Sequence, residues 1–244
     1  AMSYGAGSGA SRLVSGTHPE HLALEEELAD WMKQPAALFF ASGYQLNVCI
    51  AQSLLQKGDM LLGDRLNHAS LVDSGQLASA HVMRYQHVDM SSLRLQLERT
   101  AAGFTRPDQA MLIASDAVFS MDGDQAPIAE LQNLAAEFQA LLVLDDAHGI
   151  GVLGQSGRGS FEEQAQSINT DTLVLGTCGK ALGTAGAFVI GDQIYIEHLR
   201  QFARSRIYST APPAALAAAT RVALKLVQTE GEHRQRLRER ITYF

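Results

Sequence analysis

Residues 141–149 read Leu-Leu-Val-Leu-Asp-Asp-Ala-His-Gly, and this stretch decides the fold class. Its first four side chains are all apolar, with no alternation between apolar and polar positions. A strand of this kind is buried on both faces, which is typical of a mainly parallel sheet between two layers of helices. The carboxylates and the imidazole that follow then fall at the carboxyl edge of the sheet, where open α/β proteins bind ligands.

Short apolar runs alternate with amphipathic helical stretches along the whole chain. Strands are predicted at residues 36–40, 60–63, 81–85, 111–119, 141–144, 173–176 and 187–190. Helices are predicted from Pro19 onward, over 45–55, 69–79, 92–101, 128–138 and 192–204, and as one long Ala-rich helix over about 213–240. No repeat or linker marks a domain boundary, so the alternation predicts an α/β fold.

Composition excludes several classes of protein. The chain has 244 residues, 46% of them hydrophobic, and 19 Lys+Arg against 26 Asp+Glu give a net charge of −7. Without a basic run there is no surface to neutralise phosphates, which argues against nucleic-acid or anionic-membrane partners. Apolar stretches such as 36–41 and 110–114 fall short of the ~20 residues of a membrane span. We therefore expect a small-molecule or protein partner.

The chain has two cysteines, Cys49 and Cys178. Two cysteines do not build a disulfide framework, and there is no CxxC motif or Cys/His cluster with zinc-ligand spacing. We therefore expect a reducing, cytoplasmic setting and no metal site.

The charged end of the 141–149 stretch has two interpretations. Asp145, nearer the strand, is expected to be less solvated than Asp146, and a buried carboxylate must be paired. An aspartate at a strand end is also a common cap of the following turn, so this segment alone favours neither function nor capping.

Four other strand ends carry reactive side chains. Lys180 follows the strand near residue 175 among small residues, which suits a reactive amine but also an ordinary surface lysine. Ser42, Gly43 and Tyr44 open a helix whose N–H groups and positive dipole end form an anion site. His68 and Ser120 lie at further strand-to-turn junctions, where local capping is the alternative interpretation.

The Gly5–Gly9 segment superficially matches a dinucleotide-binding fingerprint. No strand precedes it, and no acidic residue in strand context follows about 20 residues later, so we interpret it as a glycine-rich entry segment.

Taken together, the strand-end residues specify a cofactor. A phosphate cup, a lysine for a Schiff base, a carboxylate to keep a pyridine nitrogen protonated and a flat imidazole are what pyridoxal phosphate (PLP) requires.

The same residues resemble the α-oxoamine synthases, which are fold-type I PLP enzymes. The motifs that carry this resemblance are Gly7–His18, Ser42–Tyr44, Asp64–Leu71, Val118–Asp124, Asp145–His148, Thr177–Lys180 and Tyr208–Thr210. They occur in the family's order through nearly the whole chain. The resemblance implies a three-layer α/β/α fold with a mainly parallel, mostly seven-stranded sheet.

The resemblance also implies a role for each site residue. Lys180 binds the cofactor covalently, Asp145 pairs with its pyridine nitrogen and His68 stacks on its ring. His148 and Ser120 contact the ring hydroxyl. The residues expected at the phosphate are Gly43, Tyr44 and Thr177, with Ser209 and Thr210 reaching it from the other subunit of a homodimer.

Within the family, residues 201–204 and 207–210 most resemble the members that make 8-amino-7-oxononanoate for biotin from L-alanine and a pimeloyl thioester. Members of the glycine C-acetyltransferase, 5-aminolevulinate synthase and serine palmitoyltransferase types share the same cofactor residues and stay open as alternatives. So does a catalytically impaired domain that acts only through cofactor binding or association. The family also has an N-terminal segment and a C-terminal small domain beyond this match, so we expect residues 1–244 to be its PLP-binding large domain.

Overall fold

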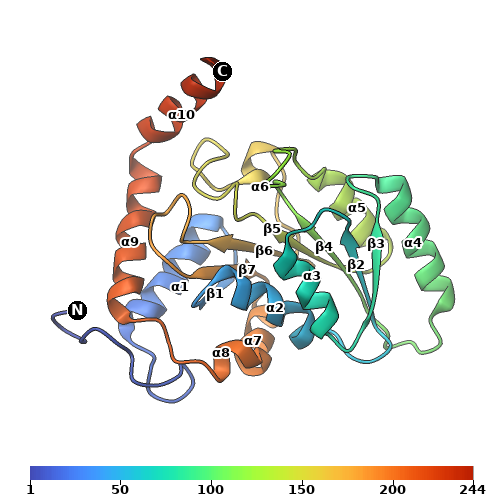
Figure 1. Ribbon diagram of the computed structural model, residues 1–244, viewed down its shortest axis with the longest axis horizontal. Helices are drawn as coiled ribbons and strands as arrows, with labels where there is room; N and C mark the ends of the chain where they lie inside the picture. Colours follow the sequence, from blue (N-terminus) through green and yellow to red (C-terminus); the bar gives the residue numbers. More distant parts are fainter. Residues whose placement is uncertain (244) are drawn as a thin grey trace.

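The structure, a computed structural model, describes residues 1–243 and contains a seven-stranded sheet between two layers of helices (Figure 1). The strands are β1 (Ala36–Phe40), β2 (Met60–Asp64), β3 (His81–Tyr85), β4 (Met111–Asp116), β5 (Leu141–Asp145), β6 (Thr172–Thr177) and β7 (Ala187–Gly191). Their order is β1-β7-β6-β5-β4-β2-β3. The predicted three-layer α/β fold is confirmed.

Five of the strands are parallel, and β7 is antiparallel to both of its neighbours. The parallel strands therefore end at one edge of the sheet, where β2, β4, β5 and β6 each finish in a polar or small residue. In the β4–β5 register, Asp116 lies directly opposite Asp145. Two carboxylates from distant segments are thereby brought side by side.

Ten helices lie in the described part of the chain. They are α1 (Pro19–Met32), α2 (Gly43–Leu54), α3 (Ala69–Leu77), α4 (Met90–Gly103), α5 (Ile128–Glu137), α6 (Ser160–Glu163), α7 (Gln193–Phe202), α8 (Arg204–Ile207), α9 (Ala214–Thr229) and α10 (Glu232–Tyr243). None of these helices is long and apolar enough to cross a membrane.

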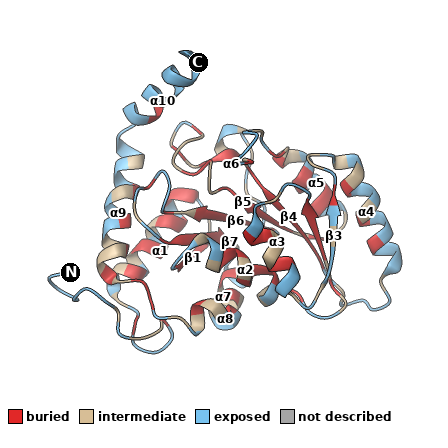
Figure 2. Ribbon diagram, in the orientation of Figure 1, coloured by how far each residue is buried: buried red, intermediate tan, exposed pale blue. Residues whose placement is uncertain are grey.

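Two apolar clusters fill the space between the layers, one on each face of the sheet, and most strand residues are fully buried (Figure 2). One cluster joins the sheet to α1, α4, α5 and α9, and the other joins it to α2 and α7. Side chains of a strand alternate between the faces, so Leu142 and Leu144 belong to the first cluster and Val143 to the second. Asp145 lies two residues after Val143, so its side chain is on the same face of the sheet as Val143, toward α2.

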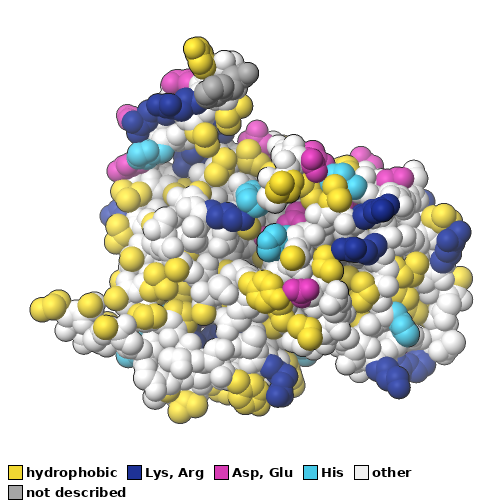
Figure 3. All heavy atoms as spheres, viewed as in Figure 1, with side chains coloured by type: hydrophobic (Ala, Val, Ile, Leu, Met, Phe, Trp, Pro, Cys, Tyr) yellow, Lys and Arg dark blue, Asp and Glu magenta, His cyan; other side chains and the backbone are white. Residues whose placement is uncertain are grey.

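The structure differs from the sequence-based expectation at two elements. The predicted strand 111–119 ends at Asp116, because Val118 leaves the sheet and pairs with Gln125 across a turn. The long predicted helix 213–240 is broken between Thr229 and Glu232, at Gly231. Beyond this break α10 projects from the body with many basic side chains on its surface (Figures 1 and 3). The last residue, Phe244, lies outside the described residues.

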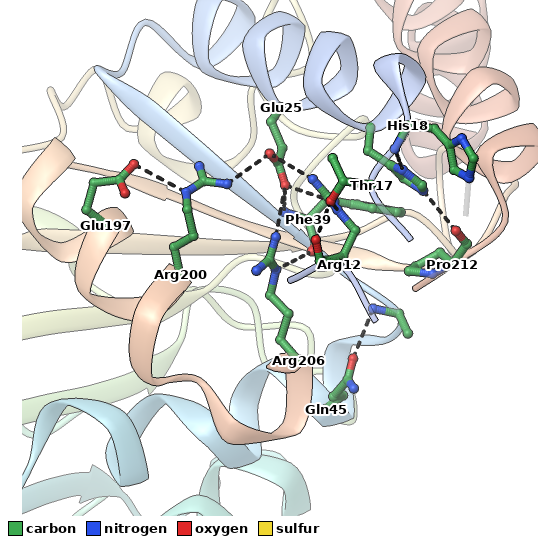
Figure 4. Close-up of polar contacts among 12 residues, drawn as sticks. Arg12, Thr17, His18, Glu25, Phe39, Gln45, Glu197, Arg200, Arg206 and Pro212 are labelled. Atoms are coloured by element: carbon green, nitrogen blue, oxygen red, sulfur yellow. Dashed lines mark hydrogen bonds and ion pairs between the residues drawn. The ribbon is translucent and has the colours of Figure 1, made fainter. Parts of the chain in front are cut away.

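A buried charge cluster ties the N-terminal loop to the helices that follow β7 (Figure 4). Glu25 of α1 is 5% exposed, and its carboxylate lies 3.1 Å from Arg12, 3.4 Å from Arg200 and 3.8 Å from Arg206. The same carboxylate accepts a hydrogen bond from the Phe39 backbone N–H of β1. The Glu25 carboxylate thus contacts four segments, namely the N-terminal loop, β1, α7 and α8, and these contacts hold α8 against the end of the sheet.

Candidate active site

A pocket of about 210 Å³ opens at the carboxyl edge of the sheet, next to the N-terminus of α2. Its walls come from the ends of β4, β5 and β6 and from the loop between β2 and α3. On the face of the molecule that Figure 3 shows, histidine, acidic and basic side chains gather near the middle. Eight residues predicted from the sequence line this pocket, namely Gly43, Tyr44, His68, Ser120, Asp145, His148, Thr177 and Lys180.

The loop between β6 and β7 presents Lys180. It closes on itself through backbone hydrogen bonds from Cys178 to Gly186 and from Thr184 to Cys178, both 2.9 Å. Lys180 Nζ lies 2.7 Å from His148 Nε2. Burial lowers the pKa of Lys180 against the opposing effect of Asp145 and Asp116, and burial followed by the Lys180 charge lowers the pKa of His148. A neutral His148 accepts the proton that Lys180 donates, so the two nitrogens form a proton-sharing pair.

Asp145 is held by groups that fix its carboxylate toward the pocket. Its Oδ2 accepts a 2.5 Å hydrogen bond from Asn47 Nδ2, and its Oδ1 accepts one of 3.0 Å from the Ala147 backbone N–H. Asn47 also lines the pocket and donates to Ser70 Oγ. Asn47 was not predicted from the sequence, although an amide one turn after the Gly43 helix start was a usable signal.

Asp116 is a second carboxylate in the pocket, and it was not predicted from the sequence either. Burial, together with the charge of Asp145, raises the pKa of Asp116 to about 7. Its Oδ2 accepts a 2.6 Å hydrogen bond from the His68 backbone N–H. Like charges this close disfavour ionisation, so Asp116 holds a proton more readily than an isolated aspartate would.

His68 caps α3 and is aligned by its own turn. Its Nδ1 lies 2.7 Å from Ser70 Oγ and accepts from the Ser70 backbone N–H at 3.2 Å. Because Ser70 also accepts from Asn47, a chain of polar groups runs from His68 to Asp145. The capping role and the pocket position are both observed for this residue.

The N-terminus of α2 forms the polar end of the pocket. Ser42 caps the helix by accepting from the Gln45 backbone N–H, and the N–H groups of Gly43 and Tyr44 belong to the first turn, which has no helical acceptors. Thr177 Oγ1 lies close by, 3.9 Å from where a Cβ on Gly43 would stand. Backbone N–H groups and a hydroxyl around a helix N-terminus suit a phosphate.

One expectation about the aspartates is wrong. Asp146 is fully buried, whereas Asp145 is 8% exposed, so Asp145 is not the less solvated of the two. Asp146 points to the opposite side of the chain, where its carboxylate accepts from the backbone N–H of Ser160 at 2.7 Å and from its hydroxyl at 2.6 Å. Burial raises the pKa of Asp146 to about 7. Asp146 is thus an anchor of the loop that carries His148.

Ser209 and Thr210 do not join the pocket of this chain. Ser209 Oγ accepts a 3.1 Å hydrogen bond from Gln45 Nε2, and Thr210 pairs with Ser11 in an isolated bridge. Their expected contact with a second subunit stays a prediction.

Comparison with known proteins places the chain among relatives of similar sequence and fold. It is 48% identical over 244 residues to 8-amino-7-oxononanoate synthase of Thioalkalivibrio sulfidiphilus, covering 100% of this chain and 61% of that protein. The solved structure of serine palmitoyltransferase from S. paucimobilis with a bound PLP–myriocin aldimine superposes with a TM-score of 0.90 at 30% identity, covering 98% of this chain and 58% of that one. The 8-amino-7-oxononanoate synthase of Francisella tularensis superposes with a TM-score of 0.79 at 31% identity, covering 93% and 64%.

The chain therefore spans about 60% of the length of the curated relatives it matches. The family of aminotransferase class I and II proteins matches residues 1–244. The pocket agrees with that match, because it brings together a Lys–His pair, a restrained aspartate and a helix N-terminus. The chain belongs to the aminotransferase class I and II family.

Proposed function

We propose that residues 1–244 form the large, PLP-binding domain of an 8-amino-7-oxononanoate synthase, which condenses L-alanine with a pimeloyl thioester and releases CO2 and the free thiol carrier. The observation that carries the proposal is the single pocket in which Lys180, Asp145, His68 and a helix N-terminus converge. The identity to 8-amino-7-oxononanoate synthases supports the choice of substrates.

The donor set of the pocket fits this cofactor. Bound PLP supplies an electron-accepting ring that stabilises negative charge at Cα of an amino acid. In our proposal, Lys180 holds its aldehyde carbon, Asp145 holds the proton of its ring nitrogen and His68 lies against the ring. His148 and Ser120 face the ring hydroxyl, and the phosphate is bound by Gly43, Tyr44 and Thr177.

The residues around Lys180 suit proton transfer. The lowered pKa of Lys180 increases the fraction of free amine near neutral pH, and a free amine takes a proton from Cα more readily. His148, 2.7 Å away, receives and returns that proton. Asp145 is kept in place by Asn47 and Ala147, so the charge that faces the ring nitrogen is fixed before any ligand binds.

The proposed protein is a homodimer in a reducing, cytoplasmic compartment. Two buried, unpaired cysteines, Cys49 and Cys178, support the compartment. The placement of Ser209 and Thr210 outside this chain's pocket supports their use at the pocket of a second subunit.

The test of cofactor binding uses the purified chain mixed with PLP and reduced with borohydride. We expect a stable label on the peptide that contains Lys180, absent from Lys180→Ala and unchanged in Lys225→Ala, whose lysine is exposed on α9. Labelling spread over several lysines, or none on Lys180, contradicts the proposed role.

The test of substrate class compares L-alanine, glycine and L-serine by the change in visible absorbance of the PLP-loaded chain, followed by turnover with pimeloyl thioesters. A preference for L-alanine supports the synthase of biotin synthesis. A preference for L-serine supports a serine palmitoyltransferase type, the second candidate favoured by the TM-score of 0.90.

A further inference from the structure

An imidazole outside the pocket lies between two carboxylates. His87 follows β3, and its Nδ1 lies 3.0 Å from Asp64 Oδ1 while its Nε2 lies 2.8 Å from Asp124 Oδ2. The Asp64 side chain is 1% exposed and that of His87 is 25% exposed. None of the three residues lines the candidate active site.

This geometry constrains the protonation of the ring. A neutral imidazole has one donor nitrogen and one acceptor nitrogen, and an ionised carboxylate only accepts. With both ring nitrogens at hydrogen-bond distance from carboxylates, only the imidazolium donates to both at once. The arrangement is therefore matched to a charged His87.

The two carboxylates belong to the two loops that carry pocket residues. Asp64 ends β2 and accepts from the backbone N–H of Leu66 at 2.8 Å, inside the loop that leads to His68. Asp124 closes the turn that carries Ser120, with the Phe119 backbone N–H donating to the Asp124 carbonyl at 3.0 Å. His87 is thus the side-chain link between the His68 loop and the Ser120 turn.

The ring of His87 also packs on the Ser120 turn. It meets the Phe119 ring edge-on, with centroids 4.4 Å apart and an interplanar angle of 87°. Phe119 is 3% exposed, so this contact seats the turn against the core. The ring contact with Phe119 and the hydrogen bond to Asp124 therefore both join His87 to the same turn, residues 119–124.

The backbone next to His87 is strained. Val88 has φ 53°, a left-handed conformation that is a genuine outlier for a β-branched residue. Its N–H donates to Asp64 Oδ2 at 2.9 Å. Such strain persists only where surrounding contacts impose it, which indicates that Asp64 dictates the path of this loop by holding both the Val88 N–H and the His87 ring.

We propose that His87, in its protonated form, is a positioning residue that holds the His68 loop and the Ser120 turn in fixed relation at the pocket. The positions of the two loops are a property of the chain without any cofactor. Only the expected effect of these positions on PLP binding rests on the proposed function.

The charges around His87 set the pH at which the link is lost. Burial lowers the pKa of His87, but the hydrogen bonds and charges of Asp64 and then Asp124 outweigh it, so the net pKa is raised. In the described part of the chain these two carboxylates are the charged groups that face the ring, and the buried Tyr85 phenol next to Asp64 stays neutral because burial raises its pKa. The link is therefore present below the raised pKa and weakens as the pH rises through it.

The test measures backbone hydrogen exchange in the chain without PLP, across pH 5 to 9, for wild type, His87→Asn and the control His81→Asn, whose histidine is exposed on β3. We expect the protection factors of the Phe119 and Gly123 amides to fall about tenfold in His87→Asn, because the turn loses its charge-assisted hydrogen bond to His87. A tenfold change corresponds to about 1.4 kcal/mol. Wild-type protection falls toward alkaline pH, His87→Asn shows no such pH dependence, and His81→Asn behaves as wild type. Equal protection in wild type and His87→Asn, or a flat wild-type profile, overturns the proposal.

Two further readouts make the outcome unambiguous. An NMR titration of His87 in the wild-type chain is expected to give a pKa above the ordinary value of about 6.5 for an imidazole, and a lower value overturns the proposal even where His87→Asn fails to fold. Titration with PLP is expected to show about tenfold weaker binding to His87→Asn at pH 6 than to wild type. Absence of a Lys180 label in wild type contradicts the proposed function alone, since hydrogen exchange needs no cofactor.

Discussion

The fully buried Asp146 carboxylate accepts hydrogen bonds from the backbone N–H and from the hydroxyl of Ser160. Replacing Ser160 by alanine removes the hydroxyl. The Ser160 hydroxyl donates to Asp146 Oδ1 at 2.6 Å, and alanine leaves that oxygen without this donor. A hydrogen bond to a charged group contributes about 1.5–3 kcal/mol. For a chain of this size we expect the melting temperature to fall by about 3–12 °C at alkaline pH.

The loss depends on pH, because it applies fully only to ionised Asp146. The folded chain holds this proton more tightly than the unfolded chain, since burial raises the pKa of Asp146 to about 7 from 3.8. The Asp146 contribution to the free energy of unfolding therefore decreases as the pH rises from about 4 to about 7. In Ser160→Ala the folded pKa rises by a further one to two units, so the decrease continues to about pH 8–9.

Urea unfolding at pH 5 and pH 9 measures this difference. We expect Ser160→Ala to reduce the free energy of unfolding by about 0.5–1 kcal/mol at pH 5, where Asp146 is neutral, and by about 1.5–3 kcal/mol at pH 9. Ser74→Ala is the matched control, because Ser74 is 2% exposed and accepts from the Ala51 backbone N–H without contacting a carboxylate. An equal loss at both pH values for Ser160→Ala refutes the reasoning.

Three more substitutions test other parts of the structure. Asn47→Leu removes the amide that donates to Asp145 and is expected to weaken PLP binding about tenfold in an absorbance titration, with unchanged binding counting against the pairing. Gly176→Ala places a Cβ in steric clash with the edge of the Phe188 ring and is expected to cost about 1–3 kcal/mol by urea unfolding, so a neutral result contradicts the close contact between Gly176 of β6 and Phe188 of β7. Glu25→Gln leaves its buried arginines without a counter-charge and is expected to cost about 3–5 kcal/mol, against little effect for the exposed control Glu26→Gln.

The sheet could be predicted from the sequence because its strands are continuous apolar runs. The predicted bounds of β1 and β3 agree with the structure, and most other strands differ by one or two residues. The break between α9 and α10 was missed because the helical pattern continues across Gly231, whose effect depends on the loss of packing beyond Thr229. The two β7 pairings, antiparallel to β1 and β6, have no signal in a strand that is buried on both faces.

The candidate site was predictable where a reactive side chain follows a strand, and less so where polarity is hidden inside an element. Lys180 and His148 stand out among small neighbours, whereas Asn47 and Asp116 lie within α2 and β4 and look like ordinary interior or capping residues. The relative burial of Asp145 and Asp146 was also beyond the sequence. An all-apolar strand gives no alternation to tell which face each successive residue takes.

The pairing of β1 with β7 sets a delay during synthesis of the chain. Phe40 pairs with Ala187, and 187 − 40 = 147 residues separate them. At about 5–20 residues per second, β1 leaves the ribosome roughly 7–30 s before its partner strand exists. All five β1 side chains are buried in the finished sheet, so this strand is an exposed aggregation-prone segment throughout that interval. Capture of β1 by β7 therefore comes late, and β1 is among the last strands to enter the sheet.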